Sequence, residues 1–206
     1  MLDQQTLSKI KNLGVKTDWN AAFAGKSKGN RHLFRVVKLA VFMAKRLDAD
    51  VTIVEAGAWL HDTALPTGDD YNYKNNKKIV KNLLINLPIS KRESAMIAEC
   101  VASHEGTTTA KTLEAQIVHD ADVLEKSGLL GIIRHTWKLA NSGGLVPGRI
   151  RRADVVKILR HLEWRAQRLQ TPFGKKMYVY LSVPPLARAR AERIISVVAT
   201  QAVRGV

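Results

Sequence analysis

The sequence has little of what would cross-link a chain or anchor it in a membrane. Its 206 residues include one cysteine, Cys100, which excludes an intrachain disulfide and lies in an apolar setting that favours a packing role over a nucleophilic one. No stretch is apolar and long enough to cross a bilayer or to form a signal peptide. The 6 prolines and 6% aromatic residues give no sign of low complexity. We expect one cytoplasmic domain over residues 1–206 with no membrane partner.

Negative charge is also scarce. The chain has 33 Lys and Arg against 18 Asp and Glu, a net charge of +15. From Arg149 to Arg204 there are thirteen basic residues and three acidic ones, so +10 of this charge lies in the last quarter. Basic surfaces attract phosphate esters and nucleic acids, but they also keep proteins soluble. The charge is therefore compatible with an anionic partner, and a solvated surface explains it equally well.

Apolar residues recur with a helical period along nearly the whole chain, which predicts an all-α fold. One short run, Met177 to Val183, could be a strand, but a single run cannot make a sheet, so we interpret it as helical. The glycine turn at 141–144 separates an expected core of about 30–140 from a C-terminal helical part of about 145–206. From cap residues and helix breakers we expect helices over about 30–47, 50–65, 74–87, 90–104, 112–125, 128–139, 153–169 and 184–203.

Four titratable residues stand at positions that the helical period places inside. His32 and His61 lie on apolar faces of separate helices, Asp62 follows His61, and Asp122 comes four residues after Val118 in a core-like helix. Buried groups of this kind are costly unless they are hydrogen-bonded or bind a metal. Two imidazoles and two carboxylates suit a divalent cation and leave positions for water and substrate. The pattern predicts a catalytic metal site.

The order of these residues resembles the HD-domain superfamily of metal-dependent phosphohydrolases. The resemblance is carried by His32 in His-Leu-Phe-Arg-Val, the doublet His61-Asp62, His104, and Asp120-Ala-Asp-Val-Leu, and it implies an HD-domain helical bundle with a basic C-terminal extension. It implies that His32, His61, Asp62 and Asp122 bind the metal. Residues two apart on a helix point about 200° apart, so Asp120 is expected to be structural.

The likeness is greatest to small stand-alone bacterial HD hydrolases and extends from about Asn30 to Arg193. Where such relatives often have a further histidine, this chain has Tyr73, so we expect one divalent ion (Mn, Fe, Ni, Co, Zn or Mg) and not two.

The resemblance implies hydrolysis of a phosphate ester, with a nucleotide as the expected substrate, by a phosphomonoesterase, phosphodiesterase or nucleotide pyrophosphohydrolase. A metal-activated water would be the nucleophile. Asp62 and His104 are the expected catalytic residues, with His104 as a proton donor to the leaving oxygen or as a phosphate contact, although His104 could equally just end a helix. Arg35, Lys78 and Arg134 are candidates for binding phosphate, with Lys74 and Lys77 at the rim.

Two alternatives stay open. The chain could be a nucleic-acid or anion-binding protein that uses the basic C-terminal part and has a vestigial metal site. Few aromatic residues interleave with the basic ones, however, which argues against a stacking platform for single strands. It could also be an HD-type di-iron oxygenase, which needs more histidine and carboxylate ligands than the sequence offers. No oligomeric state follows from the sequence.

Overall fold

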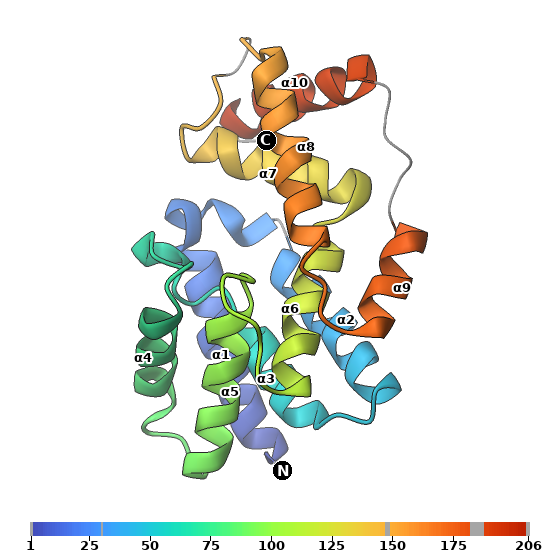
Figure 1. The fold of residues 1–206 in the computed structure, drawn as a ribbon. Coiled ribbons are helices and arrows are strands. Elements are labelled where there is room, and N and C mark those ends of the chain that lie inside the picture. The colour runs from blue at the N-terminus through green and yellow to red at the C-terminus, as the bar shows by residue number, and fades with distance from the viewer. Residues whose placement is uncertain (1, 30, 147–148, 182–187, 205–206) are drawn as a thin grey trace. The chain divides into compact units, whose positions relative to one another are not determined.

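The structure is a computed structural model that describes residues 2–29, 31–146, 149–181 and 188–204. Every regular element among these residues is a helix, which confirms the all-α prediction (Figure 1). None of the helices in these ranges is long and apolar enough to span a bilayer. The elements are α1 (Gln4–Asn20), η1 (Ala22–Gly29), α2 (His32–Arg46), α3 (Val51–Leu60), η2 (Leu65–Thr67), α4 (Tyr73–Leu84), α5 (Lys91–Ser103), α6 (Leu113–Glu125), α7 (Gly128–Asn141), α8 (Arg152–Ala166), α9 (Pro172–Leu181) and α10 (Arg188–Arg204).

Side-chain caps explain where several helices begin. The Asp50 carboxylate accepts hydrogen bonds from the backbone N–H groups of Thr52 (2.9 Å) and Ile53 (3.2 Å), so α3 begins as predicted. Ser90 and Glu93 form the predicted capping box at the start of α5, with Glu93 N donating to Ser90 Oγ and Ser90 N donating to Glu93 Oε2. Local sequence therefore determines these two helix starts.

The end of α3 differs from the prediction. We expected this helix to continue to about Leu65, but it ends at Leu60. Thr63 N then bonds to Leu60 O at 3.0 Å, and the Thr63 hydroxyl donates to the same carbonyl at 2.7 Å, which closes a turn in place of another helical turn. The doublet His61-Asp62 therefore lies in a turn at the carboxyl end of α3.

Other boundaries also shift. The helix α1, capped by Asp3, had no counterpart among the predicted helices. The predicted cap Asn30 and the predicted start Pro184 lie outside the described residues, and α2 follows Arg31, which has φ 55°. Of the run that begins at Met177, the residues up to Leu181 are helical as interpreted, in a helix that already begins at Pro172, and the rest of the run lies outside the described residues.

Contacts within the chain cluster into two compact units. The first unit comprises Met1–Asp122 and Leu169–Lys175, and the second comprises Val123–Arg168 and Lys176–Val206. Our division of a single domain into a core of about 30–140 and a C-terminal part from about 145 stays a prediction.

The first unit is built around α3, which contacts α1, α2 and α5, while α4 packs along α5 (Figure 1). The close approach of α3 to α5, and of α1 to α3, depends on glycine. A Cβ at Gly57 would lie 2.5 Å from the Cβ of Cys100 on α5, and one at Gly14 of α1 would overlap the carbonyl of Trp59. Because neighbouring helices come this near, α3 is almost wholly buried and its carboxyl end, with His61, lies in the interior.

The second unit has its own apolar core among α7, α8 and α10. Its interior is made of small and branched side chains that the helical period places on the facing surfaces. These buried residues are Ile132, Ala140, Leu145, Val155, Ile158, Ile195 and Ala199.

Two stacked imidazoles in the second unit predict a loss of stability in acid. The rings of His135 and His161 lie 4.1 Å apart at 9°. Burial lowers the pKa of His135 to about 3, assisted by the nearby positive groups of His161, Lys138 and Arg165. In the unfolded chain the pKa is about 6.5, so the unfolded state binds more protons between these values. The free energy of unfolding should therefore be highest above about pH 6.5 and should fall as the pH is lowered below that value.

We expect the free energy of unfolding to drop by about 2 kcal/mol between pH 6.5 and pH 5, since one pKa unit corresponds to about 1.4 kcal/mol. Urea unfolding followed by tryptophan fluorescence measures this change. The variant His135→Phe keeps a planar ring but cannot be protonated, so it should lose less stability over the same range. An equal loss in both proteins would contradict this role of His135.

Candidate metal centre

The four predicted ligands come from three separate helical regions of the first unit. His32 is the first residue of α2, His61 follows the last residue of α3 with Asp62 next to it, and Asp122 lies on the inner face of α6. All four side chains are buried, with His61 and Asp122 fully inaccessible. Packing of α2, α3 and α6 therefore brings together residues that are up to ninety positions apart in the sequence.

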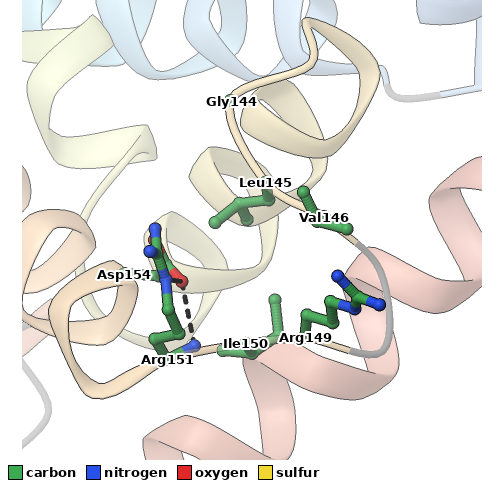
Figure 2. A pocket seen from close by; sticks show the side chains of 7 residues that line it. All are labelled: Gly144, Leu145, Val146, Arg149, Ile150, Arg151 and Asp154. Carbon is green, nitrogen blue, oxygen red and sulfur yellow. Dashed lines mark hydrogen bonds and ion pairs between the residues drawn. The ribbon is translucent and has the colours of Figure 1, made fainter.

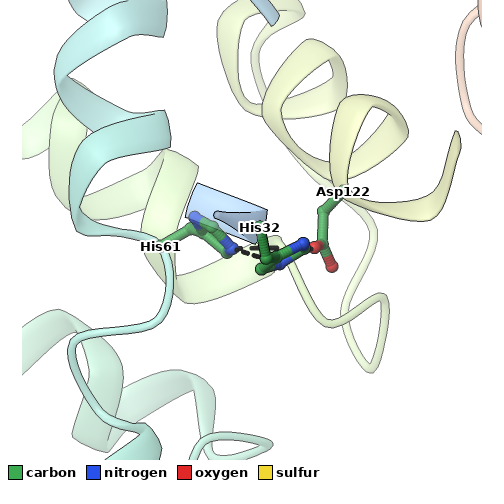
Figure 3. Close-up of side chains that lie close together, drawn as sticks. All are labelled: His32, His61 and Asp122. Carbon is green, nitrogen blue, oxygen red and sulfur yellow. Dashed lines mark hydrogen bonds and ion pairs between the residues drawn. The ribbon is translucent and has the colours of Figure 1, made fainter. Parts of the chain in front are cut away.

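Their donor atoms converge on one point. His32 Nε2 lies 3.2 Å from His61 Nε2, 3.1 Å from Asp122 Oδ1 and 3.6 Å from Asp62 Oδ2. His61 Nε2 lies 3.3 Å from Asp62 Oδ2 and 3.6 Å from Asp122 Oδ1. Figure 3 shows the two imidazoles and the Asp122 carboxylate pointing toward one another. Neighbouring ligands of one cation, each about 2.1 Å from it, lie about 3.0–3.4 Å apart. Three of the five distances fall in this range and two are 3.6 Å. The ligand atoms of His32, His61 and Asp122 all lie within 4.8 Å of one another, so these three residues could hold a single ion, with Asp62 beside the two imidazoles.

The hydrogen bonding of His61 supports the same fit. Its Nδ1 lies 2.8 Å from the carbonyl oxygen of Ala58, which assigns the proton of the neutral ring to Nδ1. The lone pair of Nε2 then faces His32 and the two carboxylates. Such a gathering of buried lone pairs and negative charge is repulsive unless a positive ion lies among them. The residues present therefore fit a divalent cation.

A second group of possible ligands adjoins the first. Asp62 Oδ1, His104 Nε2 and Glu105 lie within 4.8 Å of one another, and all three side chains are buried. His104 Nε2 lies 3.7 Å from Asp62 Oδ1 and 3.5 Å from Glu105 Oε1. Asp62 thus directs one carboxylate oxygen at each group. Sequence reasoning treated Glu105 only as the residue after a helix end, and no local signal marks its burial.

The two carboxylates determine the charge of His104. Burial alone would lower the pKa of this imidazole, but the neighbouring carboxylates of Asp62 and Glu105 outweigh burial and raise the pKa to about 10. His104 Nδ1 lies 2.7 Å from Val101 O, which fixes the ring with Nε2 toward Asp62. In this environment His104 holds its proton at neutral pH.

Asp120 and Asp122 have different partners although they are two residues apart. Asp120 is fully buried and accepts hydrogen bonds from Gln170 N (2.8 Å), Thr171 N (2.8 Å) and the Thr171 hydroxyl (2.6 Å). Gly174 allows this approach, because a Cβ there would overlap the Asp120 carboxylate. Asp120 therefore fastens the segment before α9 to α6, which is the structural role expected for it.

Two residues beside the site had no predicted role. His119 on α6 lies with Nδ1 2.7 Å from His104 O, and so ties the turn after α5 to α6. Asp18 on α1 is buried, with Oδ1 accepting a 2.8 Å hydrogen bond from Ser27. Burial raises the pKa of Asp18, and its electrostatic partners include Asp62, His32 and His61. A single sequence does not show whether a lone histidine or aspartate in a helix is buried, so neither residue could be assigned a role.

The predicted phosphate contacts occupy different surroundings. Arg35 is half-buried one turn after His32 on α2, and Lys78 is exposed on α4. Lys77 donates to Tyr73 Oη at 2.7 Å and pairs with Glu99 at 2.8 Å, so its charge is balanced within α4 and α5. Arg134 belongs to the second unit, where its Nε lies 3.9 Å from Glu125 Oε2. The substrate roles of Arg35, Lys78 and Arg134 stay predictions.

The first unit is helical, and its buried histidines and aspartates could hold a metal ion, as in helical metalloproteins. The model of the HD domain family matches residues 30–127. This part of the chain is an HD domain, a domain that is found in a superfamily of metal-dependent phosphohydrolases. The resemblance inferred from the sequence is confirmed.

Known proteins resemble the chain in part of its sequence or in its fold. Over 94 residues the chain is 31% identical to ribonuclease Y of Clostridium perfringens, an alignment that covers 46% of this chain and 17% of the relative. A Lactobacillus plantarum protein has the same fold, with a TM-score of 0.65 at 21% identity over 99% of this chain and 98% of its own. Bacillus subtilis YpgQ in complex with ADP gives a TM-score of 0.62 at 21% identity, covering 85% of this chain and 87% of its own.

Proposed function

We propose that this protein is a phosphohydrolase that uses one divalent metal ion to hydrolyse a phosphate ester of a nucleotide. The observation that carries the proposal is the close approach of His32, His61 and Asp122 in the buried interior, with Asp62 beside the two imidazoles. The HD domain supports metal-dependent hydrolysis. The ADP bound by the structurally similar YpgQ supports a nucleotide as substrate.

The four side chains of the cluster would hold the ion. When bound, a divalent cation lowers the pKa of a coordinated water and polarises a phosphoryl oxygen. The hydrogen bond from His61 Nδ1 to Ala58 O keeps this imidazole in the orientation that metal binding requires. Asp62 and Asp122 would cancel the formal charge of the ion, so cations elsewhere are needed to attract phosphate.

His104 would supply the proton for the leaving oxygen. It adjoins the metal cluster through Asp62, and the nearby Asp62 and Glu105 carboxylates favour its protonated form. A protonated imidazole can donate to the oxygen that departs from phosphorus as the P–O bond breaks. Its hydrogen bond to Val101 O holds the ring in place for this transfer.

Arginine and lysine side chains would bind the non-reacting phosphate oxygens. Arg35 is one helical turn from His32, and a planar guanidinium can bind two phosphate oxygens at once. Lys78 and Arg134 would add positive charge. In this scheme the cluster activates the attacking water, while the cations position the phosphate.

The purified chain should contain about one equivalent of a divalent metal and should release phosphate or pyrophosphate from at least one nucleotide. Metal analysis and a screen of nucleoside mono-, di- and triphosphates, with a generic phosphate ester alongside, measure both. Chelation followed by re-addition of Mn²⁺, Co²⁺, Ni²⁺, Zn²⁺ or Mg²⁺ should remove and restore activity. Two equivalents of iron with consumption of dioxygen would instead indicate the di-iron oxygenase. Hydrolysis of the generic ester without any nucleotide would contradict the nucleotide substrate.

A further inference from the structure

The positive charge of the chain is concentrated in the second unit. This unit contains fifteen Lys and Arg against four Asp and Glu, a balance of +11 out of the +15 of the whole chain. The predicted metal ligands all belong to the first unit. Chemistry at the metal cluster therefore does not account for most of the excess charge, and a separate anionic partner would.

One surface of α8 carries much of this charge. Arg152, Lys157 and Arg160 are all exposed. At 100° per residue these three positions fall within an arc of about 140°, so they share one side of the helix. Of the acidic residues of α8, Asp154 is paired with Arg151, whereas the exposed Glu163 lies about 20° from Arg152 and offsets one of these three positive charges. This side of α8 therefore keeps a net positive charge, and we call Arg152, Lys157 and Arg160 the basic face.

A flat stacked group lies on the same side of α8. Trp164 lies about 120° from Arg152 by the same helical geometry, and Arg168 follows the end of α8 at Ala166. The guanidinium of Arg168 lies 3.9 Å from the centre of the Trp164 ring, and its Nη1 donates a 2.9 Å hydrogen bond to Trp164 O. The indole in turn stacks on His161 at 6.0 Å and 18°. Both contacts hold the guanidinium plane in a defined orientation, and nucleobases stack on such planes.

A hollow of about 550 Å³ adjoins the beginning of α8 (Figure 2). Leu145, Val146 and Ile150 give it an apolar lining. Figure 2 shows Arg151 and its partner Asp154 on one side of the hollow and Arg149 on the other. An apolar recess with arginine at its edge can accommodate a base while the charge meets a phosphate.

We propose that the second unit binds single-stranded nucleic acid along α8. Arg152, Lys157 and Arg160 contact successive phosphates, and the Arg168–Trp164 pair stacks on a base. From Arg152 to Ala166 the helix rises about 21 Å, which accommodates several nucleotides. A duplex keeps its bases stacked inside, so the stacking contact favours a single strand. This binding goes beyond the proposed hydrolase activity and does not depend on it.

The test is the affinity of the full-length chain for a fluorescein-labelled oligouridylate of about 12 nucleotides, measured by fluorescence anisotropy at several salt concentrations. Three phosphate contacts predict that log K falls with log salt with a slope of about −2. The double variant Lys157→Glu/Arg160→Glu should bind about tenfold more weakly or worse, and its salt slope should be shallower by more than about one. A flat salt response would overturn the proposal.

A matched variant separates local contacts from net charge. Lys9→Glu/Lys16→Glu changes the charge of the chain by the same amount at two exposed positions of α1 in the first unit. It should alter the affinity less than about twofold, since neither lysine belongs to the proposed contact surface on α8. If both double variants lose affinity equally, binding follows overall charge and the proposed surface is wrong.

The stacking of a base on the Arg168–Trp164 pair is tested separately, with an oligonucleotide that lacks bases. An abasic oligonucleotide of equal length should bind the wild-type chain about tenfold more weakly than oligouridylate does. Trp164→Leu, which removes the ring on which Arg168 stacks, should lose this discrimination and bind both oligonucleotides alike.

Oligothymidylate in place of oligouridylate distinguishes DNA from RNA, and binding of either supports the proposal. Equal binding of abasic and base-containing strands by the wild type would overturn the stacking contact. Binding of phosphatidylserine vesicles without binding of either oligonucleotide would overturn the proposal as a whole.

Discussion

Replacing Asp122 with asparagine is expected to abolish metal binding and to lower phosphate-ester turnover by about a thousandfold or more. The substitution keeps the shape of the side chain but removes the negative oxygen that lies 3.1 Å from His32 Nε2. Metal-ion stabilisation of the transition state is worth several kcal/mol, and each 1.4 kcal/mol is about tenfold in rate. Atomic emission spectrometry of the purified variant and a phosphate-release assay measure the two effects. A variant that keeps its metal and full activity would contradict the role of Asp122 as a ligand.

Asp120→Asn is the matched control, since it makes the same chemical change two residues away. Both Asp120 oxygens accept hydrogen bonds from residues 170 and 171, so an amide NH₂ would face a donor and cost about 1–3 kcal/mol of folding stability. This variant should therefore unfold at lower urea concentration while retaining bound metal. If Asp120→Asn loses the metal and Asp122→Asn does not, the assignment of the two carboxylates is reversed.

Replacing His104 with glutamine is expected to leave the metal in place and to lower turnover of nucleotide substrates by about a hundredfold or more. The imidazole would donate a proton to the leaving oxygen, a contribution that general acids typically make at this scale. An ester with a p-nitrophenolate leaving group needs little protonation, so its hydrolysis should fall much less. Parallel rate measurements on the two substrates, with metal analysis of the same samples, test this role.

The comparison of two substrates separates proton donation from a structural effect. A variant that is merely distorted would hydrolyse both esters more slowly by the same factor. His161→Gln in the second unit is the control for replacement of a histidine outside the cluster. If His104→Gln reduces the metal content from two equivalents to one, then His104 binds a second ion together with Asp62 and Glu105, and the single-metal proposal is wrong.

The elements that sequence reasoning predicted well are those controlled by local chemistry. The capping oxygens of Asp50 and Ser90 act within three residues, so the starts of α3 and α5 could be predicted from the sequence. The helical period placed His32, His61 and Asp122 on inner faces, and the structure buries all three. The angle between residues two apart separated Asp120 from Asp122 without tertiary information, because it depends only on helix geometry.

The elements that were missed depend on contacts between distant residues. Glu105 and His119 join the surroundings of the site only because the turn after α5 packs against α6. Likewise, α3 ends at Leu60 because the Thr63 side chain competes for the Leu60 carbonyl, which helical periodicity does not register. Few aromatic residues interleave with the basic ones, but Trp164 is an exception, because Arg168 follows four residues later, just after the end of α8, and stacks on it.

The closeness of α3 and α5 has a practical consequence for labelling the protein. Cys100 is fully buried against Gly57, and burial raises the pKa of its thiol, so little reactive thiolate forms at neutral pH. Maleimide reagents should therefore leave the native chain unmodified while it is folded. A cysteine introduced at an exposed position such as Gln167 could then carry a single fluorophore without removal of the natural one. Slow uptake of reagent by the unaltered chain would in turn report how often α3 and α5 separate.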